Sequence, residues 1–309
     1  MSTSPAVAPH APAALSGTAF ATLLLIALMM GANHVAARVA FDHGVDVVTA
    51  VAFRSGITAL VVAVICWQQR VPLALQARHR WSLPAIGGLI ALQSFCLYSS
   101  VARLPVALAL LAFNLYPLFT ALWARLLYGH RAERRVLVAM PVILCGLALA
   151  LDVSGAASGL GAGAHWGRIG AGVAFAVAAA ALFGLALVIT QHEASAVDGR
   201  VRTAITMAMV GALALAAAAA QGGLHLPDAP AGWGGLLALT FLYGTAFTIM
   251  FTVLPKLGVV GNSAIMNVEP IFALVLAWAL LGQRIAAVQV AGGLIVVACV
   301  VWLGLRRRG

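Results

Sequence analysis

The chain has 309 residues, of which 63% are hydrophobic and only 8% are charged. Soluble globular proteins carry about 25% charged residues, so this composition excludes a soluble domain and indicates a multipass membrane protein. The formal net charge is +10, but the basic residues are scattered between apolar runs instead of forming one face, which argues against nucleic acid as a partner.

Ten apolar runs follow one another along the chain, each about long enough to cross a ~30 Å hydrocarbon layer as a helix. Residues 1–16 precede them and contain no Lys or Arg, so we expect a disordered tail and an uncleaved first membrane helix. The runs lie near 17–38, 47–67, 82–102, 105–127, 134–151, 168–190, 201–220, 233–255, 259–281 and 286–304. The sequence therefore predicts an all-α polytopic membrane protein with ten transmembrane helices.

The basic residues between these runs predict the orientation, because positively charged loops stay on the cytoplasmic side. With the N-terminus inside, thirteen Lys and Arg residues fall on the inner side and four on the outer side, while Arg54 falls within the second run. We therefore expect both termini to be cytoplasmic, including a basic C-terminus at 305–309.

The second half of the chain repeats the first at a constant offset of 153 residues. Residues Gly31, Asn114, Pro117, Gly129 and Arg131 are matched by Gly184, Asn267, Pro270, Gly282 and Arg284. These identities in register indicate a tandem duplication. Each copy holds five crossings, an odd number, so the copies enter the membrane in opposite senses. We predict two inverted five-helix repeats, at 17–151 and 168–304, which surround a central cavity. An outer linker at 152–167 joins them.

Local patterns accompany the repeat. The first half has Arg54 within VAFRSGITALVVAV, Tyr98-Ser99-Ser100 at the end of the third run, and NLYPLFTALWARLLYGHR from Asn114. The second half has NVEPIFALVLAWALLGQR from Asn267 and VAGGLIVVACVVW in the last run. Together they resemble the EamA-type half-transporters of the drug/metabolite transporter superfamily. The resemblance implies a ten-helix carrier that exports small metabolites, amino acids among them, by alternating access.

One departure from the family pattern concerns the ends of the fourth and ninth runs. The family usually has Gly-Glu-Arg there, whereas this chain has Gly-His-Arg with His130 and Gly-Gln-Arg with Gln283. Both expected glutamates are therefore missing, and no role of those acids carries over to this protein.

All four asparagines of the chain fall inside the predicted membrane runs, although this residue ordinarily favours turns. An unsatisfied amide in hydrocarbon is costly, so these side chains must face other helices or a hydrated cavity. Two interpretations are open for Asn33, Asn114, Asn262 and Asn267: they contact substrate, or they bond neighbouring helices. Pro117 and Pro270, which we expect to break their helices as hinges, would free carbonyls for the second interpretation.

Glu269 lies roughly 15 Å into the ninth run, near the midplane of the bilayer. A carboxylate there must be protonated, paired or hydrated, which leaves three interpretations: a proton-coupling group, a partner for a substrate ammonium, or a structural acid paired with Arg54 or His34. Arg54 in turn suits a substrate carboxylate or anchors its helix to a neighbour. His34 is a candidate for the cavity or a packing histidine.

The remaining candidates for the cavity wall are tyrosines, threonines and one glutamine. Tyr116 occupies the position in the first copy that Glu269 occupies in the second, so both should project toward the centre. The others could instead form an interfacial belt or bond within their own helices. They are Tyr98, Tyr243, Gln93, Thr245 and Thr248.

No phosphate-binding loop, metal motif or Ser/His/Asp set stands out, so we expect neither a cofactor nor a metal nor an enzyme. We predict a secondary transporter that exports small metabolites across a bacterial inner membrane, with amino acids as the favoured class. A carrier of nucleobases, sugars or hydrophobic drugs is the first alternative, and an intramembrane enzyme or non-transporting scaffold is the second. The expected partners are the solute, the lipid bilayer and, as a candidate coupling ion, the proton.

Overall fold

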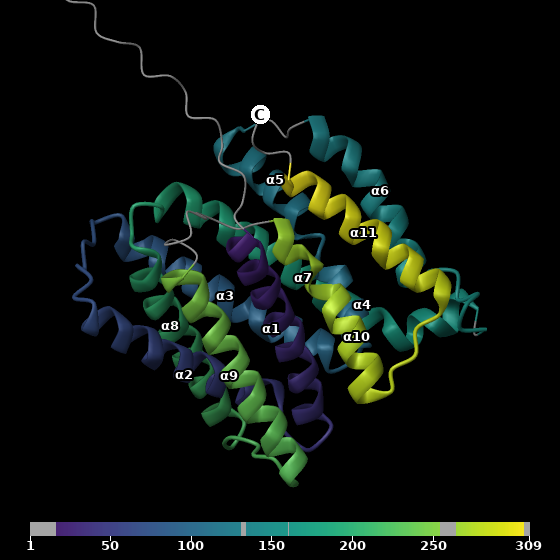
Figure 1. Ribbon diagram of the computed structural model, residues 1–309, viewed down its shortest axis with the longest axis horizontal. Coiled ribbons are helices and arrows are strands. Elements are labelled where there is room, and N and C mark those ends of the chain that lie inside the picture. The colour runs from purple at the N-terminus through teal and green to yellow at the C-terminus, as the bar shows by residue number, and fades with distance from the viewer. Residues whose placement is uncertain (1–16, 131–133, 160, 254–263, 306–309) are drawn as a thin grey trace, which may run out of the picture.

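A computed structural model describes residues 17–130, 134–159, 161–253 and 264–305 (Figure 1). The predicted tail at 1–16, Asn262 and nearly all of the basic segment 305–309 lie outside these ranges. Within them, every regular element is a helix and there is no β-strand. The protein is therefore all-helical over the part of the chain that can be described.

Six helices make up the first half: α1 Gly17–Phe41, α2 Val47–Gln68, α3 His79–Val101, α4 Val106–Phe113, α5 Tyr116–Tyr128 and α6 Arg134–Ala150. The second half contains α7 Ala162–Glu193, α8 Gly199–Ala220, α9 Pro230–Thr252, the short 3-10 helix η2 Ala264–Val268, α10 Glu269–Leu281 and α11 Ala287–Leu305. The helix α7 begins inside the segment 152–167 that the sequence predicts as a linker.

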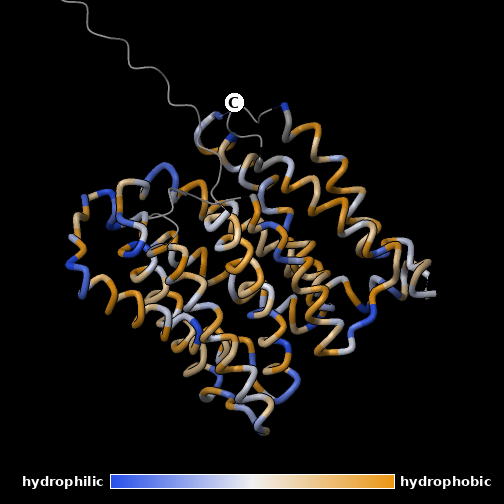
Figure 2. The backbone as a smooth tube through the Cα atoms, in the orientation of Figure 1, coloured by the Kyte–Doolittle hydropathy of each residue, from blue (hydrophilic) through white to orange (hydrophobic). Residues whose placement is uncertain are grey.

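Length and composition allow seven of the described helices to cross a membrane, with α4 and α5 taken together as one span. Three shorter apolar helices, Leu137–Ala150, Ile265–Leu281 and Ala287–Trp302, accompany them. The tube in Figure 2 is mostly hydrophobic along the helices and hydrophilic at the turns that connect them. The chain is a multipass membrane protein, and its described part begins and ends on the same side, at the top of Figure 1.

The two halves contact each other in a pattern that is unchanged when they are exchanged. The helix α1 packs against α9 and α10, and its counterpart α7 packs against α3 and α5. The contacts of α2 with α8 and of α6 with α11 each join a helix to its own counterpart, and α2 packs against α9 as α8 packs against α3. A two-fold relation between the halves requires this pattern.

Two glycines show the same relation at atomic detail. A Cβ atom built on Gly31 would lie 3.1 Å from the backbone nitrogen of Ala273, and one built on Gly184 would lie 2.8 Å from that of Thr120. Ala273 and Thr120 are themselves 153 residues apart. Small residues let membrane helices approach closely, and here the same approach occurs once in each half.

The fourth helix of each half is broken. Between α4 and α5 the break lies at Asn114 and Leu115, and Pro117 occupies the first turn of α5. Proline has no N–H group, so the carbonyl of Phe113 loses the bond that a continuous helix would make. In the second half η2 gives way to α10 at Glu269, with Pro270 in the first turn. In each half a helix therefore begins inside the protein, beside the proline that the sequence marks as a hinge.

The turn after α6 is stabilised by Asp152. Its carboxylate accepts hydrogen bonds from the backbone N–H groups of Ala157 (3.1 Å) and Ser158 (2.9 Å). Burial alone would raise the pKa of Asp152, but these bonds, the Ser158 side chain and nearby His165 lower the pKa below its ordinary value of 3.8. The carboxylate therefore stabilises the folded state when it is ionised.

We expect Asp152→Asn to lower the unfolding temperature of the detergent-purified protein at neutral pH. Because the pKa is lowered in the folded state, the stabilisation is present above the unfolded pKa and is lost as the pH falls through the folded pKa. The difference from wild type should shrink in acid, as thermal unfolding measured across that range would show. Equal unfolding temperatures at neutral pH would contradict this role.

Candidate functional site

Arg54 lies at the centre of a buried cluster although it belongs to a membrane helix. It is 3% exposed on α2, and its guanidinium carbon lies 4.6 Å from the ring centroid of Tyr98 on α3 and 4.1 Å from that of Tyr243 on α9. Its Nη2 donates a hydrogen bond of 2.8 Å to Ser94 Oγ. Aromatic rings stabilise a cation without neutralising it, and no carboxylate of the described chain forms an ion pair with Arg54.

Tyr98 extends the cluster to α1. Its hydroxyl donates to Asn33 Oδ1 at 3.1 Å, and its ring meets the ring of His34 edge-on, with centroids 5.7 Å apart. Both residues on α1 are buried. Tyr98 therefore connects the cation on α2 to the polar residues on α1.

Glu269 brings the second half of the chain to this cluster. It is the first residue of α10, where the helix dipole favours a negative charge. Its Oε1 lies 3.3 Å from His34 Nε2, and its side chain is 23% exposed whereas that of His34 is 3% exposed. Of the three interpretations of Glu269, the pairing with His34 is present in this structure. Partial exposure leaves the carboxylate able to meet another group.

Tyr116 lies at the matching break in the first half and forms a different wall. Its hydroxyl donates to Asn267 Oδ1 at 2.8 Å, which joins α5 to η2. Its ring centroid lies 5.6 Å from that of Phe113 and 5.2 Å from that of Phe183. The structure thus brings together an aromatic wall around Tyr116 and a polar cluster around Arg54.

Polarity in this region is concentrated in the first half of the chain. At the same offset of 153, Asn33, His34, Arg54, Ser94 and Tyr98 are matched by Ala186, Leu187, Met207, Phe247 and Phe251. Glu269 and Tyr243 are exceptions, because their counterparts in the first half are Tyr116 and Ile90. The elements of the site are related by the two-fold repeat, but most of its polar side chains come from the first half.

Three further predicted residues make other contacts. Thr248 bonds the Gly244 carbonyl on its own helix at 2.8 Å, and Thr245 is partly buried on the same helix. Gln93 is buried, and its Oε1 accepts a long hydrogen bond of 3.5 Å from Ser94. Gln93 therefore contacts the cluster through Ser94, whereas Thr245 and Thr248 lie on α9, the helix that carries Tyr243.

Asn114 ends α4 at the break. Its backbone N–H bonds the carbonyls of Leu110 and Leu111, whereas its side-chain Nδ2 is buried and finds no acceptor within the described ranges. An amide donor without a partner is costly inside a membrane protein. The side chain of Asn114 therefore differs in its hydrogen bonding from that of its counterpart Asn267, whose Oδ1 accepts a hydrogen bond from Tyr116.

The helix-end residues that depart from the family pattern have structural contacts. Gln283 Oε1 accepts the backbone N–H of Val106 at 3.1 Å and so caps the start of α4. His130 meets the ring of His192 edge-on, with centroids 5.1 Å apart. A glutamine caps as well as a glutamate would without placing a charge at the end of the helix.

Sequence reasoning missed Ser94, Phe113 and Phe183. Ser94 lies one helical turn before Tyr98, so its place on the same face of α3 could have been inferred. Nothing in the sequence separates the two phenylalanines from the many apolar residues around them.

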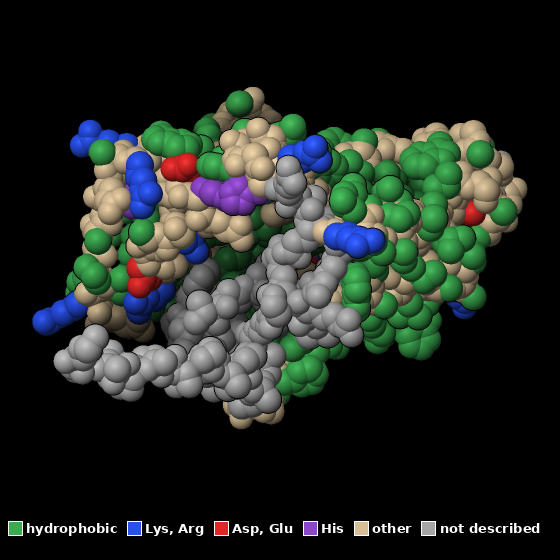
Figure 3. Space-filling view, turned by 90° about the horizontal axis from the view of Figure 1, so that it is seen from above, with side chains coloured by type: hydrophobic (Ala, Val, Ile, Leu, Met, Phe, Trp, Pro, Cys, Tyr) green, Lys and Arg blue, Asp and Glu red, His purple; other side chains and the backbone are tan. Residues whose placement is uncertain are grey.

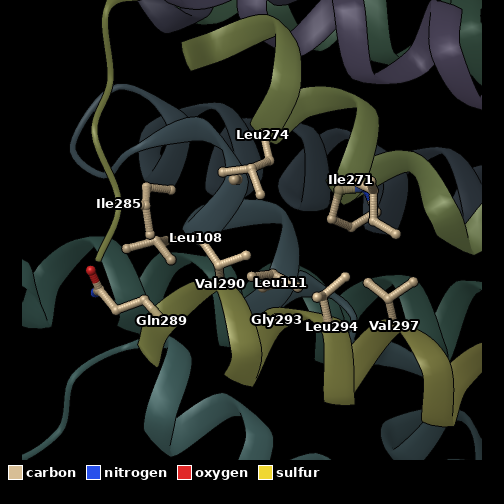
Figure 4. Close-up of a pocket in the computed structure, with 12 residues that line it drawn as sticks. Leu108, Leu111, Ile271, Leu274, Ile285, Gln289, Val290, Gly293, Leu294 and Val297 are labelled. Carbon is tan, nitrogen blue, oxygen red and sulfur yellow. The ribbon is translucent and has the colours of Figure 1, made fainter. Parts of the chain in front are cut away.

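Two pockets lie elsewhere in the protein, and neither is lined by Arg54 or Glu269. A narrow apolar crevice of about 20 Å³ lies between α4, α10 and α11, with the side chain of Gln289 at one end (Figure 4). A larger pocket of about 800 Å³ lies where α2 ends and α8 begins. The described residues contain no group of three His, Cys, Asp or Glu side chains that could hold a metal ion.

Comparison with known proteins agrees with this architecture. Residues 17–151 and 170–305 each match the model of the EamA-like transporter family. One solved structure, described as "Crystal structure of protein", has a TM-score of 0.60 at 19% sequence identity, covering 94% of this chain and 100% of the other. That likeness shows the fold alone. No curated protein sequence matches the chain significantly.

Proposed function

Because the chain belongs to the EamA-like transporter family, we propose that it is a secondary transporter that exports small metabolites, with amino acids as the favoured class, by alternating access. The two halves cross the membrane ten times in total and in opposite senses. The moving parts are the halves themselves, and the solute binds between them, where the broken helices begin.

The observation that carries this proposal is the pair of opposite charges in one cluster. Arg54 comes from the first half and Glu269 from the second, and both lie among buried residues of α1, α3 and α9. A guanidinium holds a carboxylate in two parallel hydrogen bonds, and a carboxylate holds an ammonium. An amino acid carries both groups on one carbon, so a single solute can satisfy both residues.

The aromatic wall supplies the rest of the site. Tyr116, Phe113 and Phe183 come from α5, α4 and α7 and offer apolar surface to the solute. Nucleobases, sugars and hydrophobic drugs remain the first alternative, but none of them requires a buried cation and an acid together. The charge pair therefore favours a zwitterion over these solutes.

The orientation in this proposal places both termini in the cytoplasm of a bacterium, with the protein in its inner membrane. Figure 3 looks onto the side where the described chain begins and ends, and it shows Lys and Arg side chains around that face. The positive-inside rule places a face that carries basic residues in the cytoplasm.

Flux into proteoliposomes tests the function. The purified protein would be reconstituted, and counterflow would be measured for a panel of amino acids, nucleobases and sugars. We expect amino acids to exchange faster than in empty vesicles. If no solute crosses faster than in empty vesicles, the transporter proposal fails, and if nucleobases or sugars alone cross, the amino-acid assignment fails.

A pH gradient tests the coupling ion in the same vesicles. If Glu269 carries the proton, Glu269→Gln should abolish the response of flux to the gradient while exchange at equal pH continues. An unchanged gradient response in Glu269→Gln would remove Glu269 from the proton path, and binding of a solute ammonium or pairing with His34 would remain as its role.

A further inference from the structure

The contacts at the two helix breaks are not equivalent in this structure. Exchange of the halves turns Tyr116 and Asn267 into Glu269 and Asn114. The first pair is joined by a hydrogen bond of 2.8 Å. In the second, Glu269 instead faces His34 at 3.3 Å, and the Nδ2 of Asn114 has no acceptor in the described chain although the residue is only 5% exposed.

The ends of α2 and α8 show a second difference between equivalent places. The pocket of about 800 Å³ lies between the end of α2 and the start of α8, and Ala204 lines it. The equivalent place at the other side is the start of α2 near Val51, which is 0% exposed. There the segment between α8 and α9 contacts the start of α2, since the backbone N–H of His225 donates to Thr49 Oγ1 at 2.9 Å. One side is therefore open where the other is closed.

A protein made of inverted repeats reaches its opposite access state when the halves exchange conformations. In that state the contacts of one half appear in the other. Such an exchange would bring together two groups. One is the Nδ2 donor of Asn114, which has no acceptor in the described chain, and the other is the carboxylate of Glu269. The counterpart of His34 is Leu187. The contact between His34 and Glu269 therefore has no polar equivalent in the other half.

We propose that Asn114 is the second partner of Glu269 and a positioning residue of the transport cycle. In the opposite access state Glu269 leaves His34 and accepts a hydrogen bond from Asn114 Nδ2, while Tyr116 releases Asn267. The space near Ala204 closes and the space near Val51 opens at the same step. This inference rests on alternating access as proposed above.

Cysteine labelling tests it without any solute. Ala204→Cys or Val51→Cys would be introduced after replacement of the four native cysteines, Cys66, Cys96, Cys145 and Cys299, by alanine. The rate of reaction with a polar maleimide would be measured in nanodiscs, where both faces are accessible. The two reporters lie at equivalent positions of the repeat, so each serves as the control for the other.

Removal of Asn114 and removal of His34 should shift the equilibrium between the two access states in opposite directions. Asn114→Ala weakens the opposite state, so labelling at position 204 should rise relative to labelling at position 51. His34→Leu, which copies the second half, weakens the present state and should lower the same ratio, each by roughly tenfold. Asn114→Leu is near-isosteric and has no hydrogen-bond donor, so it should repeat the effect of Asn114→Ala if that variant does not fold.

The background variant Glu269→Ala separates this mechanism from general damage. Neither substitution should change the labelling ratio there, because both act through the same carboxylate. Shifts in the same direction, or shifts that persist in Glu269→Ala, would overturn the proposal. Failure of the transport function is a separate result, since it appears as absence of flux for every solute.

Discussion

Arg54→Gln is expected to abolish the preference of the transporter for amino acids over their amides. The guanidinium of Arg54 is the buried cation of the cluster, with two tyrosine rings and Ser94 as its neighbours. Loss of one partner of a buried, hydrogen-bonded charge pair costs about 2–5 kcal/mol. Flux of amino acids at low concentration should therefore fall by about 30-fold or more.

The comparison of two solutes separates binding from folding. A carboxamide analogue has no negative charge, so it should be transported by Arg54→Gln at least as well as by wild type. If Arg54 only anchors α2 to α3 and α9, flux of the amino acid and of its amide should fall in parallel. Unfolding temperatures of both proteins would show how much of the change is structural.

Arg103→Gln provides the matched control. Arg103 also lies over an aromatic ring, with its guanidinium carbon 4.9 Å from the centroid of Phe175. It is exposed at the end of α3 and does not contact the cluster. We expect its replacement to leave both fluxes close to wild type. A similar loss in Arg103→Gln would show that any stacked arginine matters equally.

Much of the fold could be predicted because it depends on local sequence. Apolar length predicts where helices form, and α2 and α8 begin and end within two residues of the predicted runs. The repeat also predicts which helices are equivalent, and the close approaches at Gly31 and Gly184 follow from it. The break at Asn114 and Leu115 was harder to place, since proline acts on a carbonyl one turn earlier.

The partners in the site depend on packing that the sequence does not contain. Glu269 could have met Arg54 or His34, because the three residues belong to α10, α2 and α1 and their spacing along the chain says nothing about distance. Only the crossing of α1 with α10 decides that His34 is the neighbour. The role of Phe183 likewise depends on α7 packing against α5.

The contact between α6 and α11 leaves no room for a side chain larger than that of glycine. A Cβ atom built on Gly292 of α11 would lie 2.5 Å from the carbonyl oxygen of Gly146 and 2.5 Å from the backbone nitrogen of Ala150, both on α6. These are backbone atoms of a helix, so they cannot turn aside as a flexible side chain can. The two helices must separate to admit even one methyl group.

We therefore expect Gly292→Ala to destabilise the protein by about 1–3 kcal/mol, the usual cost of overpacking, and to lower its unfolding temperature in detergent. Gly88→Ala on α3 and Gly234→Ala on α9 are matched controls, because a Cβ at either glycine meets no atom within 4 Å. Alanine stabilises a helix more than glycine does, so these variants should be as stable as wild type or slightly more so.

The folded fraction of Gly292→Ala should keep the wild-type KM, because α6 and α11 contribute no residue to the cluster around Arg54. Equal unfolding temperatures for all three variants would show that α6 and α11 are free to separate, and the contact would then be a candidate for motion instead of a rigid support.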